Sequence, residues 1–207
     1  MARLNVNPNR MELSRLKKRL VVAKRGHKLL KDKQDALIKA FLERAREAKV
    51  LREELEDELR ECYKSFLLAR AQTLPAMLEQ ALMISGAKCE LNVAYKNVMS
   101  VMVPEYAVEQ GGSPMNYGLA STLGSLDVAL ERFARLIPQL ILLAAREKAI
   151  SLMAVEIEKT RRRVNALEHV LIPGFVETIR YITMKLDEQE RSTLSRLMKI
   201  KEIVRSH

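Results

Sequence analysis

Apolar residues recur every three or four positions over two long stretches of the chain, one near each end. This spacing is typical of helices that bury one narrow apolar stripe, as in a coiled coil. Since one short connection joins the two stretches, we expect two helices that fold back on each other as an antiparallel pair, each about 100 Å long at a rise of about 1.5 Å per residue. The first stripe contains Leu13, Leu16, Leu20, Ala23, His27, Leu30, Gln34, Leu37, Phe41, Ala45, Ala48, Leu51 or Arg52, Leu55, Leu59, Cys62, Phe66 and Ala69.

The second stretch has a similar stripe, interrupted by two prolines. Pro138 and Pro173 lie inside sustained helical periodicity, so we expect each to kink or loosen the helix without necessarily ending it. The stripe contains Leu119, Leu123, Leu126, Leu130, Phe133, Ile137, Leu140, Leu143 or Ala144, Ile150, Ala154, Ile157, Val164, Leu167 and Leu171, followed by Ile179, Ile182, Leu186, Leu197, Ile200 and Val204.

The segment between the two stretches has a different period. Apolar and polar residues alternate around Leu91, Val93 and Tyr95, which indicates a β-strand. With a turn at Lys96–Asn97 and an end at Pro104, the pattern predicts a short β-hairpin. The sequence therefore predicts an all-α dominated fold in one structural unit. The N-terminal helix lies in residues 1–84; it starts near Pro8–Asn9, where the asparagine can cap free backbone N–H groups, weakens at Pro75 and ends around Ser85–Gly86. A hairpin and loop follow in 85–118, and a C-terminal helix in 119–207.

Charge is distributed unevenly along the chain. The 207 residues include 36 Lys and Arg against 26 Asp and Glu, a net charge of +10. Met1–Asp35 holds eleven basic residues against three acidic ones, and Arg191–His207 holds five against one. In an antiparallel hairpin these segments are neighbours, so one tip of the molecule should be basic. For any single Lys or Arg, a merely solvated helix surface is the better explanation of the charge.

The sequence offers no chemistry for catalysis. There is no glycine-rich phosphate loop, no nucleophile beside a base, and no cluster of metal ligands, so we expect no catalytic, cofactor-binding or metal site. The two cysteines, Cys62 and Cys89, show no pairing or metal-binding spacing, which favours a reducing compartment. No apolar run of about 18 residues and no signal-peptide block is present, so we expect neither a membrane-spanning nor a secreted protein.

Two basic segments carry a resemblance to a known family. The first runs Asn9-Arg10-Met11-Glu12-Leu13 through Lys17-Lys18-Arg19-Leu20 to Arg25-Gly26-His27-Lys28-Leu29-Leu30-Lys31-Asp32-Lys33, and the second runs from Lys159-Thr160-Arg161-Arg162-Arg163-Val164-Asn165-Ala166-Leu167-Glu168 to Leu171-Ile172-Pro173. Both segments, together with the order helix, hairpin, helix, resemble the D subunit of vacuolar- and archaeal-type (V/A-type) rotary ATPases over nearly the whole chain. Gly174 and residues 87–118 match the family least.

The resemblance implies a non-catalytic rotor shaft at the cytoplasmic face of a membrane, present in a single copy per complex and not as a homo-oligomer. Its implied partners are the catalytic A and non-catalytic B subunits of the head, the small F subunit of the central stalk, and a funnel subunit that links the shaft to the membrane ring. The shaft would transmit torque between ATP hydrolysis or synthesis in the head and translocation of H⁺ or Na⁺. The sequence does not distinguish the two ions or the two directions.

We expect two groups of contact residues. The hairpin residues Leu91, Val93, Tyr95, Val98, Val101 and Val103 are candidates for contact with the side or funnel subunit, because alternating strands offer an edge or a face for docking. The candidates for head contacts are Lys17, Lys18, Arg19, Lys24, Arg25, Lys28, Lys31, Arg161, Arg162, Arg163, Lys199 and Lys201.

Two other classes of protein fit the same pattern. A basic coiled coil could bind nucleic acid through its phosphates, which would require Lys and Arg along one continuous face and strong salt dependence. The low aromatic content, 4%, argues against recognition of single strands by base stacking. A homodimeric scaffold is the third option, and it can be distinguished because antiparallel pairing within one chain would leave the rod monomeric.

Overall fold

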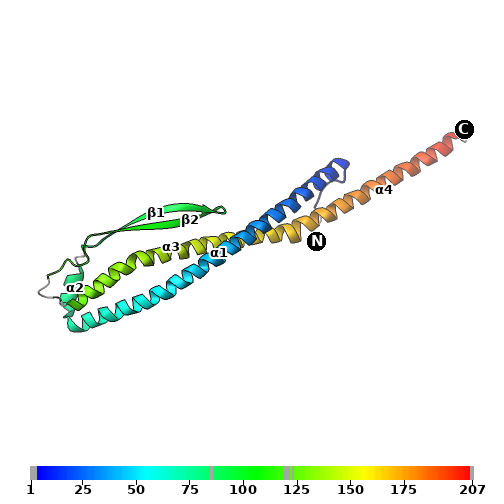
Figure 1. The fold of residues 1–207 in the computed structure, drawn as a ribbon. Coiled ribbons are helices and arrows are strands. Elements are labelled where there is room, and N and C mark those ends of the chain that lie inside the picture. Colours follow the sequence, from blue (N-terminus) through cyan, green and yellow to red (C-terminus); the bar gives the residue numbers. More distant parts are fainter. Residues whose placement is uncertain (1–3, 84–85, 119–121, 123, 206–207) are drawn as a thin grey trace. The chain divides into compact units, whose positions relative to one another are not determined.

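The computed structural model describes residues 4–83, 86–118, 122 and 124–205 (Figure 1). The elements are α1 (Arg10–Gln72), α2 (Pro75–Met83), β1 (Lys88–Val98), β2 (Val101–Gly111), α3 (Gly124–Ala166), the π-helix η1 (Leu167–Leu171) and α4 (Ile172–Arg205). The chain forms two compact units. Unit 1 comprises residues 1–36 and 157–207, and unit 2 comprises residues 37–156, so that α1 and α3 each contribute to both.

In unit 1, the beginning of α1 packs antiparallel against η1 and α4. Arg10 at the start of α1 forms an ion pair with Glu190, and His27 Nε2 lies 3.2 Å from Glu168 Oε2 in η1. As the residue number rises along α1, that of the contacting residue falls, which defines an antiparallel pair. The buried side chains of this unit are small or aliphatic and come from α1, the end of α3 and α4: Leu16, Thr160, Val164, Thr178 and Ile182.

Helix α1 starts where the sequence predicts. Asn9 Oδ1 accepts a hydrogen bond from the backbone N–H of Glu12 at 2.7 Å, which satisfies one of the free donors of the first turn and confirms Asn9 as the cap. The preceding residues contact α4, because the N–H of Leu4 donates to Thr178 Oγ1 at 3.2 Å. Thr178 in turn donates to the carbonyl oxygen of Gly174 at 2.7 Å, so this buried hydroxyl has both its donor and its acceptor role filled.

A π-helical turn accommodates Pro173. The proline has no N–H and its ring crowds the carbonyl one turn earlier, which disfavours regular α-helical geometry there. The chain responds with η1, in which the N–H of Ile172 bonds the carbonyl oxygen of Leu167. The helix continues into α4, which confirms that Pro173 loosens the helix without ending it. Pro138 likewise lies inside α3.

In unit 2, the rest of α1 packs antiparallel against α3. The contacts run in opposite directions along the two helices: Arg52 pairs with Glu147 at 3.1 Å, Cys62 Sγ lies 3.8 Å from the carbonyl oxygen of Ala129, and Gln72 accepts from Ser125 at 3.0 Å. The predicted antiparallel helix pair is therefore confirmed within each unit. One core cluster comprises Leu55, Cys62 and Leu136, and another comprises Ala69, Leu78, Ala81 and Leu126.

The first predicted stripe is confirmed, and it contains Leu51 instead of Arg52. Every other member is buried or half-buried, including the polar His27 and Gln34. The chain also loosens at Pro75, since α1 ends at Gln72 and the carbonyl of Leu74 accepts from the first turn of α2. Ser85, where we expected the helix to end, lies outside the described residues.

The second predicted stripe needs correction after Phe133. Ile137 and Leu140 are 39% and 37% exposed, whereas Leu136 is 3% exposed. Residues 136–143 are apolar at nearly every position, so periodicity alone allowed more than one phase, and packing against α1 selected another. Ala144, Ala154, Leu171, Leu197, Ile200 and Val204 are also exposed, while Ala145, Ala149 and Met153 are buried; Leu119 and Leu123 lie outside the described residues.

The hairpin is longer than predicted, and its turn lies elsewhere. β1 and β2 pair antiparallel over eleven residues each, from Lys88 opposite Gly111 to Val98 opposite Val101. The turn is Met99–Ser100, both with positive φ of 51° and 72°, and not Lys96–Asn97. Pro104 lies inside β2 opposite Tyr95, where it was expected to end the strand. A proline is tolerated there if its nitrogen points away from the paired strand.

Candidate interaction surfaces

The two units differ strongly in charge. Unit 1 contains 22 Lys and Arg against 10 Asp and Glu, whereas unit 2 contains 14 against 16. The surplus of unit 1 alone therefore exceeds the net charge of the whole chain. This asymmetry gives unit 1 a positive potential that attracts acidic partners.

All twelve predicted head-contact residues belong to unit 1 and are exposed. Ten of them lie on α1 and the end of α3, and we call these ten the basic surface. Among them Arg162 forms an ion pair with Glu158 one turn earlier on its own helix. The members are Lys17, Lys18, Arg19, Lys24, Arg25, Lys28, Lys31, Arg161, Arg162 and Arg163.

Local packing explains why the three consecutive arginines are exposed. Thr160 and Val164, four residues apart on one helix face, are 2% and 5% exposed and hold that face against the core. Arg161–Arg163 occupy the remaining faces. Because His27 contacts Glu168 and the helices are antiparallel, Lys31 lies near the level of Arg163. The structure thus brings the two basic segments of the sequence side by side.

Lys199 and Lys201 lie on a separate part of unit 1. Beyond Glu190, whose partner Arg10 begins α1, nearly every residue of α4 is exposed. Sequence reasoning placed Leu197, Ile200 and Val204 in a stripe against another helix, but they are 56%, 56% and 70% exposed. This end of α4 therefore presents apolar and basic side chains together.

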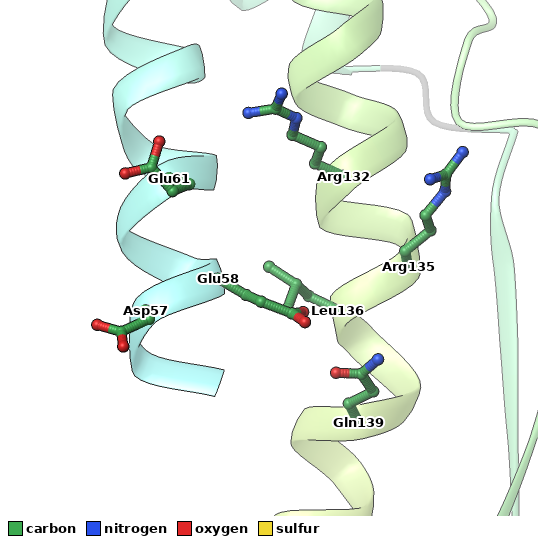
Figure 2. Close-up of a pocket in the computed structure, with 7 residues that line it drawn as sticks. All are labelled: Asp57, Glu58, Glu61, Arg132, Arg135, Leu136 and Gln139. Atoms are coloured by element: carbon green, nitrogen blue, oxygen red, sulfur yellow. The ribbon is translucent and has the colours of Figure 1, made fainter. Parts of the chain in front are cut away.

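A shallow groove between α1 and α3 in unit 2 was not anticipated. Figure 2 shows carboxylates of α1 on one side and guanidinium groups of α3 on the other, with Leu136 between the helices. Arg132 donates to Ser65 Oγ at 2.7 Å, and the hydrogen bond from Lys64 holds the pKa of Glu61 below its ordinary value. The basic and acidic groups come from positions far apart in the sequence, so only the fold shows their proximity. The lining residues are Asp57, Glu58, Glu61, Arg132, Arg135, Leu136 and Gln139.

The six predicted hairpin contacts fall into two groups. Leu91, Val93 and Tyr95 on β1 are 46%, 46% and 65% exposed. Val101 and Val103 on β2 are 7% and 6% exposed, and Val98 is half-buried. At its other end β2 contacts α3, where Gln110 Nε2 donates to the carbonyl oxygen of Ala134 at 2.9 Å. Of the six predicted hairpin contacts, Leu91, Val93 and Tyr95 on β1 therefore form the exposed apolar group.

Within the described ranges, no three His, Cys, Asp or Glu side chains gather closely enough to hold a metal ion. Of the two cysteines, Cys89 is exposed and Cys62 is buried, and burial raises the pKa of the Cys62 thiol. None of the described helices combines the length and apolar character that crossing a membrane requires.

Comparison with known proteins agrees with this architecture. Residues 12–202 match the family model for the ATP synthase D subunit. The chain is 55% identical over 206 residues to the V-type ATP synthase D subunit of Thermoanaerobacter pseudethanolicus, covering 99% of both proteins. It is 53% identical to the V-type ATP synthase D subunit of Clostridioides difficile, and the match covers 99% of this chain and 93% of that protein. It is 51% identical to the V-type ATP synthase D subunit of Fusobacterium nucleatum, with 99% of this chain and 98% of that protein covered.

Proposed function

Because this chain belongs to the family of ATP synthase D subunits, we propose that it is the central shaft of a V/A-type rotary ATPase, which transmits torque between the catalytic head and the ion-translocating membrane ring. The observation that carries the proposal is the full-length similarity to the D subunits of V-type ATP synthases. As one component of such a complex, the chain works together with other subunits. We propose that these are the A and B subunits of the head, the small F subunit and the funnel subunit.

The helix pairs suit a shaft. α1 runs for 63 residues without interruption, and it is packed antiparallel against a second helix in both units. Two helices joined by a continuous apolar seam resist bending and twisting better than one helix does. α3 and α4 contain Pro138 and Pro173, whereas α1 contains no proline, so the two sides of the helix pair are not equivalent. A turning asymmetric shaft presents a different surface to each head subunit, and differential contact shifts each subunit's conformational equilibrium.

We propose that the basic surface, together with Lys199 and Lys201, contacts acidic loops of the head. Exposed charges attract at long range, and each contributes only about 0 to 1 kcal/mol. Such contacts can be exchanged as the shaft turns, whereas deep interlocking packing would oppose rotation. The exposed apolar side chains at the end of α4 would add a contact that tolerates sliding.

The hairpin is the proposed attachment point for the side or funnel subunit. Leu91, Val93 and Tyr95 provide the surface, since Val101 and Val103 are already covered within this chain. The groove between Glu58 and Arg135 lies on the same unit and offers both signs of charge for a second contact.

Affinity purification tests the proposal. A tagged chain expressed in its native host should recover the head, side and funnel subunits from membranes in fixed stoichiometry after a low-salt wash. Raising the salt should weaken the head contact first, because exposed charge pairs are screened. Recovery of nucleic acid in place of these subunits would contradict the proposal and favour the phosphate-binding alternative.

Shortening the hairpin should weaken association with the side or funnel subunit, or alter ATPase regulation. The register allows a symmetric deletion of residues 91–108, with the hydrogen-bonded pair Glu90 and Glu109 joined through an Asn-Gly turn. The helices are untouched, so the thermal unfolding of their helical signal should change little. Assembly and ATPase activity both equal to those of the unmodified chain would show that the hairpin is only a connection.

A further inference from the structure

We propose that the free edge of β1 is a self-recognition surface, through which two copies of this chain pair before they enter a complex. The two β1 strands would run antiparallel and form one four-stranded sheet, in the order β2, β1, and then β1 and β2 of the second copy. This inference concerns the chain outside the complex and does not rest on the proposed function, in which a single copy is present.

The edge of β1 is long and unprotected. β1 has eleven residues, its pairing with β2 is regular throughout, and all but Val98 are exposed. An edge strand is normally protected by charged side chains, a proline, a bulge or a cover that prevents another strand from pairing with it. In β1 there is no proline, the regular register shows no bulge, and the charged Lys88, Glu90 and Lys96 alternate onto one face, so the outer backbone groups are available.

The register identifies which backbone groups face outward. A two-residue turn with positive φ at both positions closes on a hydrogen-bonded pair, here Val98 and Val101. Hydrogen-bonded and non-hydrogen-bonded pairs then alternate along the ladder. It follows that Val93 and Tyr95 direct their N–H and C=O groups away from β2.

The position of Pro104 independently supports this alternation of hydrogen-bonded and non-hydrogen-bonded pairs. The proline lies opposite Tyr95, a position that the alternation makes non-hydrogen-bonded. At such a position the backbone nitrogen of β2 points away from β1, so a proline there costs the ladder no hydrogen bond. The outward-facing groups of β1 therefore belong to Cys89, Leu91, Val93, Tyr95 and Asn97.

A two-fold axis at Val93 pairs the whole edge with itself. In that register Val93 lies opposite Val93 of the second copy, Leu91 lies opposite Tyr95, and Lys88 lies opposite Val98, so all eleven residues of each strand are paired. Each residue whose N–H and C=O groups point away from β2 then lies opposite such a residue of the second copy, which is the condition for a continuous ladder of hydrogen bonds. The exposed Leu91, Val93 and Tyr95 of both copies gather on one face.

The charges select this register as well. On the polar face, Glu90 of each copy lies opposite Lys96 of the other, which gives two symmetric ion pairs. Within one chain Glu90 is directly opposite Glu109, an unfavourable arrangement of like charges. Lys96, which pairs with Glu105 of its own chain at 3.5 Å, would also lie beside Glu90 of the second copy and relieve this repulsion. Complementary charge, apolar contact and hydrogen-bond phase thus coincide in a single register.

Sedimentation equilibrium of the isolated full-length chain tests the proposal. We expect a monomer–dimer equilibrium, with the dimer at twice the 23.7 kDa chain mass. Val93→Pro removes an outward N–H without removing a bond to β2, so it should abolish the dimer while the circular dichroism of the helices is retained. The proposal would be overturned if the wild-type chain were monomeric at about 100 µM, a concentration at which even a weak association is detected. It would also be overturned if the Val93→Pro dimer were as stable as the wild-type dimer.

A charge exchange provides a second test that leaves the backbone unchanged. Glu90→Lys and Lys96→Glu, each made alone, create two like-charge contacts and should weaken dimerisation about tenfold, equivalent to about 1.4 kcal/mol. The double variant restores opposite charges and should recover most of the affinity. If the double variant were no tighter than the single ones, the Val93-centred register, and with it this proposal, would be wrong.

Discussion

Reversing Arg161, Arg162 and Arg163 to glutamate is expected to weaken the binding of the shaft to the catalytic head by about tenfold to a hundredfold. The estimate follows from about 0 to 1 kcal/mol per exposed charge, with each reversal replacing attraction by repulsion. The three side chains are exposed, whereas the flanking Thr160 and Val164 hold the helix in its core. The substitutions should therefore alter the surface without unfolding the helix.

The measurement is ATP turnover coupled to rotation in the reconstituted complex, together with head binding at several salt concentrations. The difference in head binding between variant and wild type should shrink as the salt concentration rises, because salt screens the electrostatic interaction that the substitutions reverse. A matched control reverses three exposed bases of unit 2 that pair with acids on their own helix, Lys49, Arg60 and Lys64. Torque and coupled turnover at wild-type levels in the arginine variant would rule out this part of the basic surface as a head contact.

Truncating Leu55 to alanine is expected to lower the free energy of unfolding by about 2 to 5 kcal/mol. Leu55 is 2% exposed and packs in the cluster with Cys62 and Leu136, so its removal leaves a cavity lined by side chains from both helices. For a chain of this size, each kcal/mol lowers the melting temperature by about 2 to 4 °C.

Leu67→Ala is the matched control, since it makes the same chemical change on the same helix at a side chain that is 58% exposed. Its cost should stay within about 0.5 kcal/mol. Urea denaturation followed by circular dichroism measures both variants. Equal destabilisation by the two substitutions would mean that the seam at Leu55 does not hold α1 to α3.

The C-terminal stripe shows how far helical periodicity can be trusted. Leu197, Ile200 and Val204 recur at helical spacing and do lie on a helix, yet no helix among the described residues covers them. Periodicity reports which residues share a helix face. It does not report whether another element is long enough to reach that face, and α1 begins at Arg10, beside Glu190.

Two long helices, their antiparallel pairing and a strand-rich centre were determined by the sequence alone. In α1 one apolar phase dominates, so the residues that face the core could be named from Leu13 to Ala69. The cap at Asn9 and the loosening at Pro75 and Pro173 also followed from local chemistry, since each depends on neighbours within one helical turn.

Tertiary structure alone decided the features that depend on distant neighbours. Packing against α1 chose Leu136 over Ile137 in an apolar run that allowed either. Strand pairing put the turn at Met99–Ser100 and let Pro104 remain inside β2, because its nitrogen faces away from the ladder. Local propensity is a property of a few adjacent residues, whereas register and burial are set by which segment lies opposite, and the chain specifies that only when it is folded.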